Sequence, residues 1–88
     1  MRSELDIFAE MTLKRGGVWY RLDEKNGYSV YKTQDKYTEY NYTGYTTPVY
    51  QIYNTDGKRV FASTNFTETM IKFRQLTELI TYNENKAT

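Results

Sequence analysis

Tyrosine is the residue type that dominates this sequence, and its spacing points to contact chemistry rather than catalysis. Six of the ten tyrosines lie between positions 37 and 53 of the 88-residue chain. A tyrosine offers a large apolar ring with a hydroxyl that needs a partner, so it suits a half-buried strand, a protein-binding surface or a platform on which bases stack. Tyr50 and Tyr53 fall on opposite faces of a clear strand and are predicted to be structural. The other four are predicted to bind a partner: Tyr37, Tyr40, Tyr42 and Tyr45.

The side chains that carry most enzyme chemistry are missing. The sequence has no histidine and no cysteine, which removes the commonest general base, the thiolate nucleophile and the commonest nitrogen and sulfur metal ligands. Ser3, Ser29 and Ser63 stand in no nucleophile-elbow pattern. Acids such as Asp35 and Glu39 have no known ligand spacing. We therefore expect a protein that is not an enzyme and that binds no cofactor and no metal.

A second set of residues has side chains suited to nucleic acid: Lys14, Arg15, Trp19, Arg21 and Lys32. A two-residue turn at Asn26-Gly27 would place Arg21 opposite Lys32 and Trp19 opposite Gln34 on an outward face. In one interpretation this face is solvated, and Trp19 covers the stems of the two bases. In the other, the bases contact phosphates while Trp19 or Tyr28 stacks on a nucleobase.

Part of this region resembles a known DNA-binding domain. The segment Lys14-Arg15-Gly16-Gly17-Val18-Trp19-Tyr20-Arg21, followed later by Thr64-Asn65-Phe66-Thr67-Glu68 at a helix start, is similar to the pattern in the small N-terminal arm-binding domains of phage-type tyrosine recombinases. In that family a three-stranded sheet lies in a DNA groove against one helix. The segment between the two motifs is longer here by a hairpin. The resemblance implies nucleic-acid binding by the basic face.

Turn and capping signals predict the elements that position these residues. Ser3 and Asp6, with bases before a double glycine, predict a short helix over residues 4 to 14. Strands over 18 to 22 and 28 to 33 flank Asn26-Gly27, and strands over 49 to 53 and 59 to 63 flank Asp56-Gly57. A two-residue turn at Asp56-Gly57 would pair Tyr53 with Val60, Ile52 with Phe61 and Tyr50 with Ser63. Asn65 and an apolar stripe predict an amphipathic helix over residues 65 to 82.

These elements predict one α+β domain over residues 1 to 88: a short N-terminal helix within 1 to 15, a small antiparallel sheet of four to five strands in two hairpins over 17 to 64, and a C-terminal helix. Residues 36 to 47 lack firm signals and are predicted to be a mobile, tyrosine-rich extension, and residues 83 to 88 a frayed tail. We expect both helices on one face of the sheet. Ile71 and Leu79 lie outside the apolar stripe, which predicts a second contact with the N-terminal helix or another subunit.

Composition fits a folded, soluble protein. The net charge is +1 and 39% of residues are apolar. No apolar run approaches the ~20 residues of a membrane span, and the first residues lack the apolar core of a signal peptide, so we expect no membrane contact and a cytoplasmic location. Abundant tyrosine, asparagine and threonine beside few alanines fit AT-rich coding DNA, as in a bacteriophage or mobile element of a bacterial host.

Three functions remain open at this point. The first is a non-enzymatic protein-binding module, such as a phage or mobile-element inhibitor or adaptor that acts on a host protein through its tyrosine-rich surface. The second is a small nucleic-acid-binding protein that uses the Trp19 hairpin face, although eleven acids nearly balance twelve bases. The third is a homodimeric structural protein whose exposed aromatics form its own interface.

Overall fold

The computed structural model describes residues 2–87, with side chains described up to residue 78, and it confirms the predicted α+β fold. The Ser3 hydroxyl accepts a hydrogen bond from the Asp6 backbone N–H, which caps the first helix as predicted. The elements follow in the order α1 (Glu4–Lys14), β1 (Val18–Lys25), β2 (Tyr28–Gln34), β3 (Lys36–Glu39), β4 (Tyr42–Tyr45), β5 (Val49–Tyr53), β6 (Arg59–Ser63) and α2 (Phe66–Ala87).

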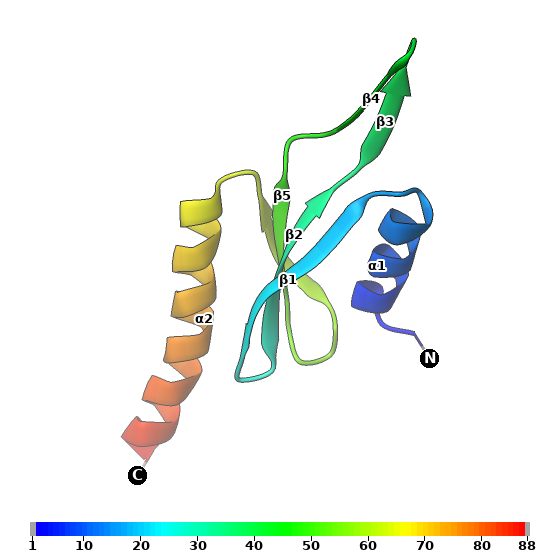
Figure 1. Ribbon diagram of the computed structural model, residues 1–88. Coiled ribbons are helices and arrows are strands. Elements are labelled where there is room, and N and C mark those ends of the chain that lie inside the picture. The colour runs from blue at the N-terminus through cyan, green and yellow to red at the C-terminus, as the bar shows by residue number, and fades with distance from the viewer. Residues whose placement is uncertain (1, 88) are drawn as a thin grey trace.

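Four strands form one antiparallel sheet in the order β1-β2-β5-β6, and β3 and β4 form a separate two-stranded hairpin (Figure 1). The β1–β2 turn has Asn26 at φ 53° and Gly27 at φ 82°. Both values lie in the left-handed region that a mirror-image hairpin turn requires, as the Asn-Gly pair predicts.

The β5–β6 hairpin has most of the predicted register. Tyr50 pairs with Ser63 and Ile52 with Phe61, as expected. A bulge next to Ile52 makes Arg59 the partner of Tyr53, where the sequence predicts Val60. The two-residue turn is replaced by a longer loop from 54 to 58, which is closed by two backbone hydrogen bonds.

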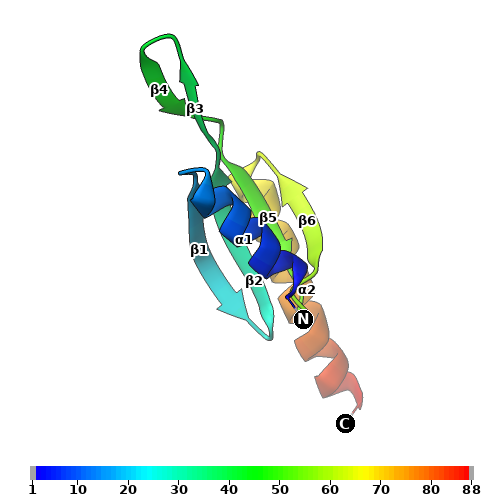
Figure 2. The ribbon, with the colours of Figure 1, turned by 90° about the vertical axis from the view of Figure 1, so that its right-hand side faces the viewer.

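The two helices lie on opposite faces of the sheet, and the expectation that both lie on one face is wrong. In Figure 2, α1 lies in front of the sheet and α2 behind it. The central strands β2 and β5 are largely buried, and a strand whose two faces are both buried needs cover on both sides. Ile71 therefore lies on the other side of the sheet from α1, and it stays exposed. Leu79, the other residue of that prediction, lies outside the described side chains.

Each face of the sheet has its own packed layer. On the α2 side, the buried core is Val30, Ile52 and Phe73, with five further apolar residues packed against it. On the α1 side, aromatic rings of three strands meet: Trp19 lies 5.3 Å from Tyr31 and 6.0 Å from Tyr53 between ring centroids. Such aromatic contacts bury large areas and prefer tilted geometries like these.

A bulge at Leu22 corrects the predicted register of the first hairpin. Near the turn the predicted pairs hold, but between Arg21 and Asp23 the register shifts. Arg21 then pairs with Tyr31 rather than with Lys32, and Trp19 pairs with Thr33. Because one extra residue moves all residues beyond it to the other face, Leu22 packs on the α2-side core and Trp19 joins the aromatic layer under α1.

Helix α2 begins as predicted and ends later. The Asn65 side-chain oxygen accepts a hydrogen bond from the Glu68 backbone N–H at 2.8 Å, which caps the helix. The helix continues to Ala87, through most of the segment that was predicted to fray. No glycine or proline follows residue 65, so the residue types that usually stop a helix are missing.

Candidate functional site

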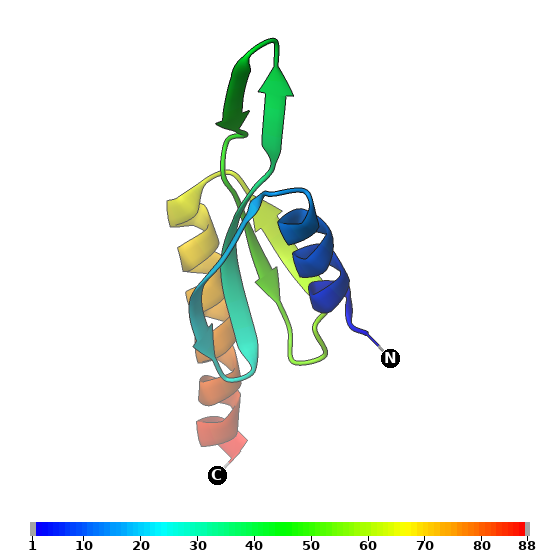
Figure 3. The ribbon, with the colours of Figure 1, turned by 45° about the vertical axis from the view of Figure 1, so that its right-hand side comes forward.

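All four tyrosines predicted to bind a partner lie on the β3–β4 hairpin, and all four are exposed. Within residues 36 to 47, predicted to be a tyrosine-rich extension, Lys36–Glu39 and Tyr42–Tyr45 form two paired strands. Figure 3 shows this hairpin extending from one end of the domain, beyond both helices. The radius of gyration of 15.3 Å exceeds the roughly 12 Å of a compact chain of this length, in keeping with that extension. The exposed fractions are 41% for Tyr37, 95% for Tyr40, 64% for Tyr42 and 50% for Tyr45.

Tyr40 stands at the hairpin tip in an unfavourable backbone conformation. Glu39 pairs with Tyr42, so Tyr40 and Asn41 form the turn. The φ of Tyr40 is 55°, in the left-handed region that costs an L-residue about 1 kcal/mol. Hairpin turns usually place glycine, asparagine or aspartate there. Backbone strain of this kind concentrates at functional sites, so the tip is the first place to look for a contact.

One face of the hairpin is a tyrosine surface built around Gly44. Tyr37 pairs with Gly44 across the strands, and its ring lies over the glycine. A Cβ atom on Gly44 would lie 3.2 Å from Tyr37 Cζ and 2.9 Å from Tyr42 Cε1. The rings of Tyr37 and Tyr42 have centroids 6.2 Å apart, tilted by 51°, a favourable aromatic arrangement. The missing side chain at Gly44 therefore allows the two rings to form one surface.

A short hydrogen-bond network fixes the base of the hairpin to the sheet. The Thr46 N–H donates to the Asp35 carbonyl oxygen, and the Asp35 N–H donates to Thr46 Oγ1, both at 2.9 Å. The Gln34 side-chain amide donates to the Thr46 carbonyl oxygen at 3.0 Å. The Asp35 carboxylate forms an ion pair with Arg15, just after α1, at 3.2 Å. An isolated two-stranded hairpin is only marginally stable, so this network supports the orientation of the hairpin.

The five residues predicted to bind nucleic acid do not share one surface. Trp19 lies on the α1 side of the sheet, half-buried against Tyr31 and Tyr53. Lys32 directly follows Tyr31 in β2 and therefore faces the α2 side, where Tyr20 is its cross-strand partner. The sheet itself separates Trp19 from Lys32.

The remaining basic residues of that set are next to acids or apart from Trp19. Arg15 pairs with Asp35 at 3.2 Å, and Arg21 pairs with Glu24 at 3.0 Å. Lys14 lies in the last turn of α1, where a positive charge is favourable at the helix C-terminus. Each of these three charges therefore has a favourable interaction within its own domain.

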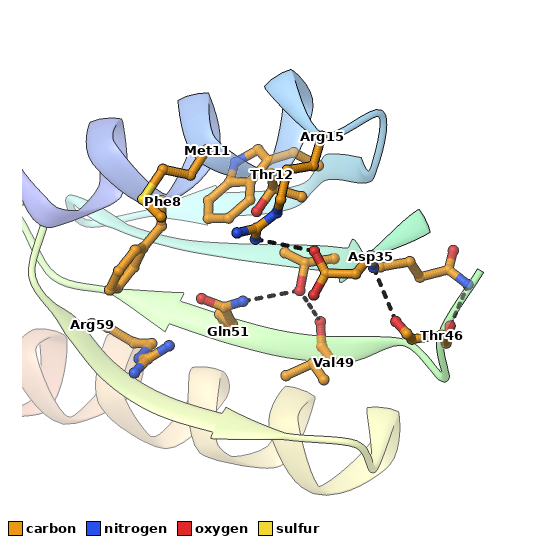
Figure 4. A pocket seen from close by; sticks show the side chains of 12 residues that line it. Phe8, Met11, Thr12, Arg15, Asp35, Thr46, Val49, Gln51 and Arg59 are labelled. Atoms are coloured by element: carbon orange, nitrogen blue, oxygen red, sulfur yellow. Dashed lines mark hydrogen bonds and ion pairs between the residues drawn. The ribbon is translucent and has the colours of Figure 1, made fainter. Parts of the chain in front are cut away.

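A cleft between α1 and the sheet is a feature that the sequence analysis missed (Figure 4). Its volume is about 350 Å³. Phe8 and Met11 of α1 form one wall, Val49 and Gln51 of β5 form the floor, and Arg59 of β6 lies at the open side. The prediction of both helices on one face hid this cleft. The available signal was Gln51, a polar residue between apolar neighbours in a central strand.

A chain of buried hydrogen bonds runs below this cleft. The Tyr53 hydroxyl donates to Gln51 Oε1 at 2.5 Å, Gln51 Nε2 donates to Thr33 Oγ1 at 2.9 Å, and the Thr33 hydroxyl donates to the Val49 carbonyl oxygen at 2.9 Å. Burial raises the pKa of the Tyr53 phenol to about 12, while nearby Arg59 opposes the shift. Tyr53 is therefore neutral at physiological pH and acts as a hydrogen-bond donor.

The described residues show neither a metal site nor a membrane-spanning helix, and the comparisons with known proteins find no relative. Among the described side chains, no group of acidic residues is arranged to hold a metal ion. Within the part of the chain that the structure describes, no helix combines the length and apolar character needed to cross a membrane. Comparison with family models, curated proteins and solved structures finds no match. The function has to be inferred from the geometry of the chain itself.

Proposed function

We propose that this protein is a non-enzymatic binding module, an inhibitor or adaptor, that engages a partner protein with its β3–β4 hairpin. The observation that carries the proposal is Tyr40, which is 95% exposed at the hairpin tip with a φ of 55°. A ring in this position adds nothing to the core of its own domain and costs backbone strain. A contact outside the chain gives a physical reason for a tyrosine there.

The composition of the hairpin favours a protein over a nucleic acid as the partner. Between residues 37 and 46, tyrosine, threonine, asparagine and glycine surround a single charged residue, Glu39. Tyrosine supplies contact area at low side-chain entropy cost, and the small polar residues supply adaptable hydrogen bonds. Interface cores between proteins are poor in charge, whereas a phosphate backbone is bound by lysine and arginine.

The shape of the hairpin supports insertion into a concave site of the partner. Tyr40 would be the anchor, because buried aromatic side chains at the centre of an interface contribute most binding energy. Tyr42 and Tyr45 would flank it and exclude water. The composition of the chain favours an inhibitor or adaptor that is encoded by a phage or mobile element and acts on a host protein in the cytoplasm.

Site-specific photocrosslinking tests the proposal. Benzoylphenylalanine at position 40, in protein expressed in the cells that naturally carry the gene, should form an adduct with one partner protein. The matched control places the same residue at Tyr20, which is 62% exposed on β1 and lies outside the hairpin. Adducts of the same protein from both positions, or no adduct from position 40, would contradict the proposal.

A triple variant gives the second arm of the test. Replacing Tyr40, Tyr42 and Tyr45 by serine should abolish partner capture and leave the urea midpoint close to that of the wild type. An unfolded variant would mean that these rings belong to the folded core. The alternatives have their own signatures: salt-dependent binding to short DNA for the nucleic-acid prediction, and a doubled native mass for the homodimer.

A further inference from the structure

The α1 side of the sheet is only partly covered, and the uncovered part forms the cleft described above. Helix α1 packs mainly on β1, whereas α2 packs on β2, β5 and β6 on the other face. Gln51 and Tyr53 of β5 are buried on this side, whereas Arg59 and Ala62 of the edge strand β6 stay exposed beside the helix. The cleft volume of about 350 Å³ lies at the small end of the range for small-molecule sites.

Four of the twelve residues that line the cleft are apolar or aromatic, and the other eight are polar or charged. Phe8 and Met11 contribute from α1, Val49 from the floor, and Trp19 contributes its ring from β1. A pocket in which apolar surface lies beside placed polar groups can hold a small organic ligand. The donors then determine which chemical class can bind.

Arg59 is the available cation of this cleft. Its guanidinium lies 5.0 Å from the centroid of the Phe8 ring. Among the described side chains it forms no ion pair, whereas Arg15 at the other end of the cleft is paired with Asp35. The nearby Glu4 carboxylate accepts its hydrogen bond from the Arg59 backbone N–H at 2.9 Å. The guanidinium of Arg59 thus keeps donors for an external anion.

Gln51 adds a neutral donor at the floor of the cleft. Its side chain is 9% exposed, with the oxygen held by Tyr53 and one amide hydrogen donated to Thr33. Within the described residues, no acceptor takes the second amide hydrogen. The hydrogen bonds to Tyr53 and Thr33 fix the amide orientation, so this donor is preorganised.

The geometry points to a binding site for a small organic anion in this cleft, with a carboxylate against Arg59 and Gln51 and an apolar or aromatic body against Phe8, Met11 and Trp19. Charge complementarity selects an anion, because the Arg59 guanidinium packs on the Phe8 ring and forms no ion pair among the described side chains. The cleft is separate from the tyrosines of the hairpin. The inference therefore does not rest on the proposed protein-binding function.

Trp19, the only tryptophan, lines the cleft and gives a direct readout. Titration of the wild type with 4-phenylbutyrate should produce a saturable change in its fluorescence, with a dissociation constant of about 1 mM or below. The uncharged 4-phenylbutanamide should bind about tenfold more weakly, because it lacks the charge-assisted hydrogen bond. Equal affinity of acid and amide, or no saturable response to the acid, would overturn the inference.

Variants locate the site. Arg59→Gln should weaken phenylbutyrate binding about tenfold, while Arg59→Lys should restore most of it. Arg21→Gln is the matched control, since Arg21 is an exposed arginine that does not line the cleft, and it should bind like the wild type. Equal affinity of Arg59→Gln and the wild type would overturn the inference. If Arg59→Gln fails to fold, comparing the affinities of the wild type for 4-phenylbutyrate and 4-phenylbutanamide still tests the inference.

Discussion

Replacing Tyr53 by phenylalanine should lower the stability of the domain and remove part of its pH dependence. Tyr53 is fully buried, and burial raises the pKa of its phenol to about 12. Its hydroxyl donates to Gln51 Oε1 at 2.5 Å. Phenylalanine keeps the ring that contacts Trp19 and Tyr31, but it leaves the buried Gln51 oxygen without this donor.

The expected size of the effect follows from this geometry. Near neutral pH, Tyr53→Phe should lower the free energy of unfolding by about 1 to 2 kcal/mol, because a buried acceptor loses its donor. Above pH 10 the wild type should itself lose stability. The phenol ionises near pH 10 in the unfolded state and near pH 12 in the native state, so the unfolded state binds fewer protons in this range and stability falls as pH rises.

The loss should amount to about 1.4 kcal/mol per pH unit in this window. The phenylalanine variant lacks the group and should not show this part of the pH dependence. The difference in free energy of unfolding between the wild type and Tyr53→Phe should therefore have its whole value near pH 8. It should be close to zero near pH 11, roughly one unit above the pKa of the phenol in the unfolded state.

Urea unfolding followed by Trp19 fluorescence measures both proteins at the two pH values. Trp19 is a suitable probe because its ring centroid lies 6.0 Å from that of Tyr53. Tyr20→Phe is the matched control, since Tyr20 is 62% exposed, and its gap to the wild type should stay small at both pH values. A Tyr53→Phe gap that is the same near pH 8 and near pH 11 would refute a neutral, buried phenol in the native state.

Two further changes test local packing. Gly44→Ala places a methyl group within 3.2 Å of Tyr37 and 2.9 Å of Tyr42. The rate of amide hydrogen exchange in β3 and β4 should therefore rise about fivefold, equal to about 1 kcal/mol, while the rate at Ile52 stays unchanged. An unchanged exchange rate in the hairpin would contradict this packing. Asn65→Ala removes the acceptor for the Glu68 N–H and should cost about 1 kcal/mol in urea unfolding, whereas a variant as stable as the wild type would show that the cap is dispensable.

The sequence by itself determined the local features of this protein. The Asn26-Gly27 turn, the Ser3 cap of α1 and the Asn65 cap of α2 were all predicted, and the structure has each of them. Each depends on atoms only a few residues apart, so residue types at fixed offsets are enough to predict it. The exposure of the four hairpin tyrosines was also within reach, because a segment with so many rings and so few core partners has little to pack against in a small domain.

The tertiary structure decided which faces meet. A single bulge at Leu22 moved Trp19 from the predicted outward face to the aromatic layer under α1, since a period of two along a strand makes every later position depend on one inserted residue. The positions of the helices depended on β2 and β5 being buried on both faces, a property of the assembled sheet. The open cleft with Arg59 and Gln51 exists only because α1 covers part of that face. Residues far apart in sequence form it, and no local pattern encodes their meeting.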